Sequence, residues 1–211
     1  MSDLPGSRHL SDLPGPRHLS DLKGSRRVSG LKEVMLALPD GTLHQPQRFH
    51  AAIYGAFAEP GRPRDFLFKG LALGAEVAIV RARTFRDDLG AQARPITYDP
   101  ARDSYEFHLT AAPQYRDQAT QKLRFLPIAD AHLSHHLAWL ERKARICGFV
   151  LDGDIGLDRG ILSVPQKGGL AIDHCEFSGR LVVTDHERFE AALEHGIGPR
   201  AGYGYGLLSL Y

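Results

Sequence analysis

The 211-residue chain has little cysteine and no long apolar segment. Cys147 and Cys175 are too few and too far apart to form a metal-type cysteine pair or a disulfide framework. No apolar run approaches the roughly 20 residues that a membrane-spanning helix needs, and the N-terminus carries no apolar signal segment. These absences exclude a disulfide-rich secreted domain, and we expect a cytoplasmic protein.

The chain also lacks an excess of charge of either sign, because 26 Lys and Arg residues are balanced by 25 Asp and Glu. No overall field therefore indicates a nucleic-acid partner, and any basic surface must come from local clustering. Arg83 lies at the end of one expected strand, and Arg116, Lys122 and Arg124 surround an expected hairpin. The hairpin group is the better candidate for contacting the groove of a nucleic acid.

Residues 2–28 contain a nine-residue repeat, in which Ser2–Leu10 recurs almost unchanged at 11–19 and more loosely at 20–28. Proline and glycine in these units oppose a continuous helix or strand. We expect residues 1–29 to form a disordered leader. A basic arm that binds nucleic acid is the alternative.

The rest of the chain alternates between strand and helix patterns. Strands are expected at 31–38, 66–73, 77–83, 105–110, 123–126, 149–151, 160–164, 172–183 and 207–210. Helices are expected at 46–58, 129–146 and 187–194, and residues 86–102 read as a polar connection. This order predicts an α+β fold of tandem ferredoxin-like (RRM-like, βαββαβ) domains. We expect the N-terminal domain at 30–115 and the C-terminal domain at 116–211.

Glycine recurs close to the C-terminus, with an arginine and tyrosines between the glycines. Glycine lets a ligand approach the main chain, and successive N–H groups can bind an anion. Arginine donates to phosphate, and tyrosine rings stack on unpaired bases. The pattern predicts a nucleic-acid backbone clamp, although a turn that only lets a helix and a strand pack is the alternative. The clamp residues are Gly198, Arg200, Gly202, Tyr203, Gly204 and Tyr205.

His50 is the most informative histidine. It follows Phe49, which faces the expected core, so its imidazole lies at the edge of the buried stripe of the helix. Gln47 precedes it by three residues and Tyr54 follows it by four, so both lie on the same helix face. Imidazole carries protons near neutral pH. His50 is therefore a candidate acid or base, and a boundary histidine without a chemical role is the alternative.

Other acidic and histidine groups give no metal site. His132 and His136 have the spacing of a zinc pair, but no third ligand is evident, so a solvated polar face is favoured. Asp152, Asp154 and Asp158 lack the spacing and terminal glutamate of a calcium loop, so a hairpin turn is favoured.

Several short segments, taken in their order and spacing, resemble one family. They are Phe49-His50, Arg64–Phe68, Leu126–Ile128, Leu137–Lys143, Gly196–Pro199 and Gly204–Leu210. From about Leu31 to Tyr211 the chain resembles the CRISPR repeat-RNA endoribonucleases of the RAMP superfamily, specifically the CasE branch. The repeated leader has no counterpart in that pattern.

The resemblance implies tandem ferredoxin-like domains that bind the stem-loop of a CRISPR repeat transcript and cut at the 3′ base of the stem. The implied reaction uses no metal or other cofactor. The upstream 2′-hydroxyl attacks the scissile phosphate and leaves a 2′,3′-cyclic phosphate and a 5′-hydroxyl. The resemblance also implies that the product stays bound in an effector complex, whose other subunits are further partners.

The resemblance also assigns residue roles. His50 matches the catalytic histidine of the first helix, and Lys167 is the nearest match to a lysine on a loop of the second half. The pattern usually has a tyrosine where Gln47 stands, so Tyr54 is our candidate substitute and Gln47 a phosphate contact. A lysine is common in the pattern where Ala201 stands, and the neighbouring Arg200 is our candidate to replace its charge. These departures indicate a divergent branch, and CasE-like enzymes also occur in type IV systems.

Two other functions stay open from the sequence. A subunit that holds the repeat hairpin without cutting it is favoured by Gln47, because an amide cannot act as a phenol. A binder of a small nucleotide is disfavoured, because the glycine loop runs from an expected helix to a strand rather than from a strand to a helix.

Overall fold

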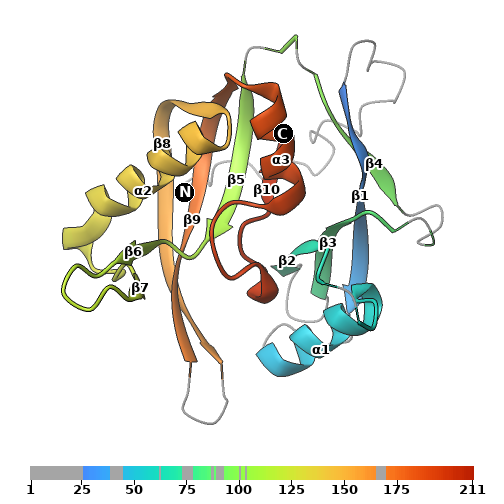
Figure 1. The fold of residues 1–211 in the computed structure, drawn as a ribbon, viewed down its shortest axis with the longest axis horizontal. Helices are drawn as coiled ribbons and strands as arrows, with labels where there is room; N and C mark the ends of the chain where they lie inside the picture. Colours follow the sequence, from blue (N-terminus) through green and yellow to red (C-terminus); the bar gives the residue numbers. More distant parts are fainter. Residues whose placement is uncertain are drawn as a thin grey trace, which may run out of the picture.

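The computed structural model describes residues 26–38, 45–61, 63–72, 78–86, 88, 93–99, 101–102, 104–164 and 170–211. These residues form two four-stranded sheets and a separate two-stranded hairpin. The sheets stand side by side, with a helix and the glycine loop between them (Figure 1). In this part of the chain no helix is long and apolar enough to cross a membrane.

The first sheet has the order β2-β3-β1-β4, and every pairing in it is antiparallel. Its elements run in the chain order β1 (Arg26–Leu38), α1 (Pro46–Phe57), β2 (Leu67–Ala72), β3 (Ala78–Thr84) and β4 (Arg94–Tyr98). This is the strand order of a ferredoxin-like domain, with a connection in place of the second helix among the described residues. β2 is an edge strand, so one side of its backbone needs cover from elsewhere.

The second sheet has the order β10-β5-β9-β8 and is also antiparallel. Its elements are β5 (Tyr105–Ala111), α2 (Leu133–Ile146), β8 (Phe149–Val164), β9 (Leu170–Val183), α3 (His186–His195) and β10 (Leu208–Leu210). The hairpin of β6 (Gln114–Arg116) and β7 (Leu123–Phe125) is inserted between β5 and α2. Apart from this insertion the half is a complete βαββαβ unit, which confirms the predicted α+β, tandem ferredoxin-like class.

Helix α1 packs one apolar face on the first sheet. Ile53 and Phe57 are fully buried against Phe66, Phe68 and Val80. Pro46 suits the start of the helix, because its missing N–H would have no helical partner there.

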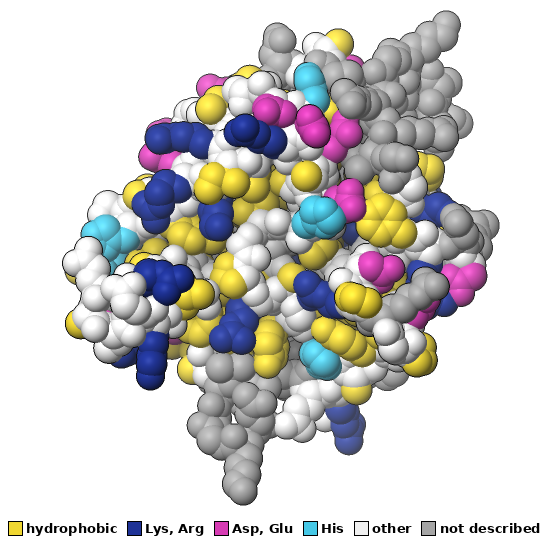
Figure 2. All heavy atoms as spheres, viewed as in Figure 1, with side chains coloured by type: hydrophobic (Ala, Val, Ile, Leu, Met, Phe, Trp, Pro, Cys, Tyr) yellow, Lys and Arg dark blue, Asp and Glu magenta, His cyan; other side chains and the backbone are white. Residues whose placement is uncertain are grey.

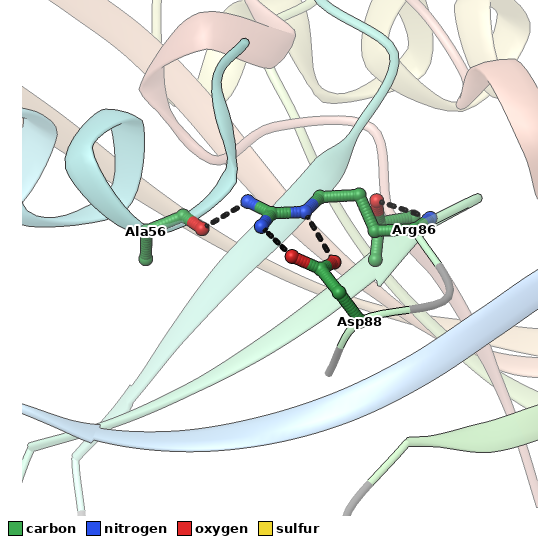
Figure 3. Close-up of polar contacts among 4 residues, drawn as sticks. Ala56, Arg86 and Asp88 are labelled. Atoms are coloured by element: carbon green, nitrogen blue, oxygen red, sulfur yellow. Dashed lines mark hydrogen bonds and ion pairs between the residues drawn. The ribbon is translucent and has the colours of Figure 1, made fainter. Parts of the chain in front are cut away.

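The far end of α1 is tied to the end of β3 by one arginine. The Arg86 guanidinium donates to the Ala56 carbonyl at 2.7 Å and forms a two-pronged ion pair with Asp88 (Figure 3). Because the last carbonyls of a helix have no helical donor, this contact both caps α1 and fixes its direction over the sheet.

Helix α3 joins the two halves. Its N-cap is Asp185, whose carboxylate accepts from the Arg188 N–H at 3.1 Å. Phe189 on this helix is fully buried, and the Tyr98 ring from β4 packs edge-on against it at 5.6 Å between centroids. Leu31 and Ile96 of the first sheet belong to the same buried cluster. The second half therefore covers the face of the first sheet that lies opposite α1.

Arg83 is a structural residue of this joint, and the prediction that it contacts RNA is wrong. Its side chain is 4% exposed. The Nε atom donates to Glu33 Oε2 at 3.2 Å, and Nη1 donates to the Leu193 carbonyl near the end of α3 at 3.3 Å. A guanidinium held in this way cannot reach a ligand in solvent.

Some sequence expectations differ from the structure in extent. Strand 105–111 pairs with β9 and β10, so it opens the second sheet instead of ending the first. We therefore propose a boundary near residues 99–104 in place of 115/116. The fourth strand of the first sheet is β4, inside the stretch expected as a polar connection. The alternating residues that predict a strand at 105–110 indicate a strand but not its partner.

Two further expectations are corrected. β8 is continuous from Phe149 to Val164, because pairing with the long β9 absorbs the expected turn as a register shift between Asp152 and Gly156. β1 begins at Arg26, so residues 26–29 of the expected leader belong to a strand, in which Arg26 and Arg27 pair with β4. Residues 1–25 lie outside the described part, so disorder in the leader stays a prediction.

We expect Arg83→Met to lower the free energy of unfolding by about 2–4 kcal/mol, because it leaves the Leu193 carbonyl and one side of Glu33 without a charged donor. Arg81→Met is the matched control, since Arg81 lies on the same strand, 3.6 Å from Glu33, with a more exposed side chain. The Arg81→Met variant should lose less than about 1 kcal/mol of its free energy of unfolding. Denaturant unfolding measures the stability of both variants. Equal losses of stability would contradict the role of Arg83 in joining the two halves.

Candidate functional site

The candidate site is built around the His50 imidazole on α1. The Tyr54 ring lies one turn further on and stacks on it, with centroids 4.1 Å apart and planes at 17°. The Tyr203 ring, from the glycine loop, has its centroid 6.2 Å from that of His50. The i, i+4 spacing on a helix thus brings an imidazole and a phenol face to face, as the sequence predicts.

His50 is half-buried, and its environment favours the neutral imidazole. Burial lowers its pKa below the ordinary value, and the nearby Arg64 guanidinium lowers the pKa further. Both causes disfavour a second positive charge. A histidine of this kind is ready to accept a proton near neutral pH.

The glycine loop, residues 196–206, wraps around the free edge of β2. Gly196 lies against the Leu67 side chain on one face of that strand, and Gly204 lies against the Phe68 ring on the other. Gly204 has φ +87°, and an added Cβ there would be 3.2 Å from the Phe68 ring. Only glycine fits this position without strain. Close packing, the alternative to a nucleic-acid clamp, therefore explains why glycine is needed at these two positions.

The same loop reaches α1 beyond the strand edge. A Cβ at Gly202 would lie 3.3 Å from the Tyr54 hydroxyl and 3.7 Å from Arg64 Nη1. The loop backbone is thus within contact distance of the phenol that stacks on His50. His50, Tyr54 and the glycine loop therefore lie together in the structure.

A pocket of about 230 Å³ opens at this junction of the two halves. The first half contributes α1 and β2, and the second half contributes β5, β8, β9 and the glycine loop. The lining residues are Phe49, His50, Lys69, Gly70, Thr110, Ile161, Leu162, His174, Glu176, Gly202, Tyr203, Gly204 and Tyr205. Imidazoles, a lysine and accessible backbone in one hollow suit an anionic ligand.

Tyr205 contributes to the pocket wall in a way that its sequence pattern does not indicate. Its side chain is buried, with 5% of the residue exposed, and its hydroxyl lies 3.3 Å from His174 Nδ1. Burial raises the pKa of this phenol. The ring is therefore not an open face for a base, which corrects the expected stacking role, whereas Tyr203 keeps a partly exposed ring beside His50.

A second basic region lies on the hairpin. Arg116, Lys122 and Arg124 are exposed on β6–β7, where Arg124 pairs with Asp117 at 3.2 Å and Arg116 donates to the Gln121 carbonyl. The Arg200 guanidinium of the glycine loop lies 5.5 Å from the Phe125 ring of the same hairpin. Lys and Arg side chains gather over this hairpin and α2 on the face seen in Figure 2. The basic residues thus continue from the glycine loop onto the hairpin.

The remaining predicted residues have different fates. Gly198 lies against the Trp139 ring of α2, where a Cβ would be 3.0 Å away, so its role is in packing. Gln47 is exposed on the first turn of α1. Lys167 lies outside the described residues. His136 is fully buried, so the expectation of a solvated polar face is wrong for this residue. His132 Nδ1 lies 3.3 Å from His135 Nδ1.

Sequence reasoning missed several polar groups of the pocket. Lys69 stands in an apolar strand, and His174 and Glu176 lie on the β9 face that also carries the buried Ile172. Polar residues alternating with apolar ones on a strand are a usable signal. The pattern cannot say that two strands from different halves meet, so it did not find this pocket.

Comparison with known proteins gives one consistent result. The sequence model of the family described as CRISPR associated protein matches residues 22–211. The CRISPR-associated endoribonuclease Cse3 of Thermus thermophilus is 31% identical, with 80% of this chain and 90% of that protein covered.

Solved structures agree with this. CRISPR endoribonuclease Cse3 bound to a 19-nucleotide RNA superposes with a TM-score of 0.68 at 28% identity, over 85% of this chain and 98% of that one. Thermus thermophilus Cse3, bound to an RNA representing a pre-cleavage complex, gives 0.66 at 26% identity, over 86% and 98%. Cas6e from Escherichia coli K-12 gives 0.59 at 20% identity, over 85% and 97%, which shows the shared fold.

Two of the loop glycines that approach the first half, Gly202 and Gly204, should differ in their tolerance of a methyl group. We expect Gly204→Ala to cost about 1–3 kcal/mol, since it strains a positive φ and presses on Phe68. Gly202→Ala is the control, because its φ lies outside the left-handed range, and it should change stability by less than about 0.5 kcal/mol. Urea unfolding of both variants measures this, and equal costs would contradict the wrapping of β2.

We expect the His50 pKa, followed by NMR titration, to lie below 6.5. Arg64→Gln should raise it, because a neighbouring positive charge is removed. The value should still stay below 6.5, because burial, the larger cause, remains. Arg48→Gln, an exposed arginine on the same helix, is the control. A His50 pKa above 6.5, or one equally affected by both variants, would contradict the described environment.

Proposed function

The chain belongs to the family of CRISPR-associated proteins that includes the Cse3 endoribonuclease, and from this premise we propose that it is an endoribonuclease that binds the stem-loop of a CRISPR repeat transcript and cleaves it to give mature crRNA. The observation that carries the proposal is the stacked His50–Tyr54 pair beside the glycine loop. The related Cse3 structures contain bound RNA, which supports an RNA ligand for this chain.

The proposed reaction is a transesterification within the RNA. The ribose 2′-hydroxyl gives up its proton, O2′ forms a bond to phosphorus, and the bond from phosphorus to O5′ breaks. The departing oxygen takes up a proton, so the products are a 2′,3′-cyclic phosphate and a 5′-hydroxyl. These steps need a proton acceptor, a proton donor and charge stabilisation on the phosphate.

We assign the proton acceptor to His50, because its lowered pKa keeps the ring neutral and able to take the proton from O2′. The Tyr54 hydroxyl, next to Gly202 and Arg64, is the proposed donor to O5′. The backbone N–H of Gly202 and the Lys167 ammonium are proposed to face the phosphate oxygens, because the N–H groups of Tyr203 and Gly204 already donate to the Arg200 and Ala201 carbonyls. Tyr203, partly exposed beside His50, is proposed to stack on a base next to the cut.

The hairpin supports binding of the RNA stem. A-form RNA is recognised largely through its shape and phosphates, and exposed Arg116, Lys122 and Arg124 present positive charge on a two-stranded projection. Arg200 links this projection to the loop at the pocket. We propose that these side chains hold the stem while the strand to be cut enters the pocket past Gln47. Retention of the product in an effector complex is part of the same proposal.

A second function is favoured by one observation. Gln47, exposed on α1, occupies the position where the family pattern has a tyrosine. If Tyr54 does not replace that phenol, the chain is a hairpin-binding subunit that does not cut. The two functions share the binding surface and differ only in the chemistry at His50.

We expect the purified chain to cut its own repeat RNA in EDTA and to leave a cyclic phosphate. His50→Ala should lower the single-turnover rate at saturating protein by about 10²–10⁴-fold, the usual contribution of a general acid or base. Tyr54→Phe should lower it by at least about tenfold, because the ring stack survives and only the hydroxyl is lost. Gel assays of end-labelled RNA measure the rates.

His195→Ala is the control, since that side chain is 72% exposed at the end of α3. Cutting by His50→Ala at the unchanged rate would overturn the assignment of His50. Tight binding of the hairpin by the unchanged chain without any cut would establish the second function instead.

A further inference from the structure

A group of charged and titratable side chains borders the pocket and has no part in the reaction as assigned above. It consists of Lys69 on β2, His108 on β5 and Glu176 on β9. Lys69 Nζ lies 2.9 Å from His108 Nδ1, and His108 Nε2 lies 3.2 Å from Glu176 Oε2. The group therefore crosses from the first sheet to the second.

We propose that Lys69 is a further catalytic residue, whose ammonium contacts the scissile phosphate, and that His108 and Glu176 are the positioning residues that hold it. The inference rests on the proposed function, because it assigns a group to the same cleavage step. Lys69 and Glu176 line the pocket that also contains His50.

The hydrogen-bond directions in the group are consistent with a neutral His108. An ammonium only donates, so Nδ1 accepts from Lys69, and Nε2 is then the protonated nitrogen that donates to the Glu176 carboxylate. Burial lowers the pKa of His108, and the adjacent Lys69 lowers the pKa further. The His108 imidazole thus orients one N–H of the Lys69 ammonium, and the Glu176 carboxylate holds the imidazole in position.

The position of Lys69 suits an anion more than a structural ion pair. The ammonium is partly buried, and this burial lowers its pKa, as does Arg81, whereas Glu176 raises it. Glu176 reaches it only through His108 in the described contacts. The ammonium has three donors, of which the His108 contact uses one. A phosphate oxygen in the pocket can take the others and supply the opposite charge.

The backbone around Lys69 makes this placement rigid. Its neighbours Leu67 and Phe68 are the side chains that contact Gly196 and Gly204 of the glycine loop. The loop and the lysine are therefore fixed to each other by the same edge strand. Preorganised donors aimed at developing charge are worth about 10²–10³-fold in rate each.

Lys69→Met tests the proposal under single-turnover conditions with saturating protein and repeat RNA. The cleavage rate should fall by about 10²–10³-fold, while the Kd for the uncleavable 2′-deoxy hairpin changes by less than about threefold. Lys69→Arg should recover at least about tenfold of the lost rate, because it restores the charge. Lys143→Met, a lysine over the Trp139 ring of α2, is the control and should cut at the unchanged rate.

The positioning roles have their own readout. His108→Gln should lower the rate by about tenfold with the Kd unchanged, and it should have no further effect in the Lys69→Met background. A residue that only supports folding would add its loss in both backgrounds. Thermal melting checks that each variant folds, and Lys69→Gln replaces Lys69→Met if the latter does not.

The outcomes distinguish failure of the inference alone from failure of the proposed function. A Lys69→Met rate within about threefold of the unchanged chain overturns the inference, even if His50→Ala abolishes cutting. Weaker RNA binding by Lys69→Met, with an unchanged cleavage rate at saturating protein, also overturns the inference. Lys69 would then contribute to binding of the RNA and not to the cleavage step. If the unchanged chain binds the hairpin and never cuts it, the proposed cleavage and the inference both fail.

Discussion

The close packing of the glycine loop around the edge of β2 is the contact on which the site depends. Gly196 and Gly204 press on opposite faces of that strand through Leu67 and Phe68. Because the loop belongs to the second half and β2 to the first, this contact fixes α1 relative to β9. Together with the α3 joint, it sets the distance between His50 and the pocket wall formed by the second sheet. The glycines thus shape the site through packing before they contribute any N–H group to a ligand.

The joint between the halves also explains an irregularity of the first sheet. A ferredoxin-like unit has two helices, and the described part of the first half has only α1. Helix α3 of the second half packs on the opposite face of that sheet through Phe189, and Arg83 bonds to its last turn. One helix therefore serves both sheets. The buried Arg83 guanidinium at this joint aligns the halves and is not available to a ligand in solvent.

The sequence was sufficient for the local parts of the site and insufficient for their assembly. Helical spacing placed His50 beside Tyr54, and Pro46 marked the start of that helix correctly. The burial of Arg83 could not be predicted from the sequence, because alternation along a strand does not reveal which helix covers each face. Lys69 was missed for a similar reason: its partners, His108 and Glu176, come from the other sheet. The continuous β8 shows pairing with a long neighbour prevailing over local turn residues.

The most direct test of the account is a crystal structure of the chain with its repeat hairpin, carrying a 2′-deoxy nucleotide at the cut so that the RNA stays intact. We expect the scissile phosphate to lie in the pocket between the His50 ring and the backbone of Gly202–Gly204, with the stem along the β6–β7 hairpin. A phosphate bound on another face of the molecule, with His50 out of reach of the ribose, would contradict it.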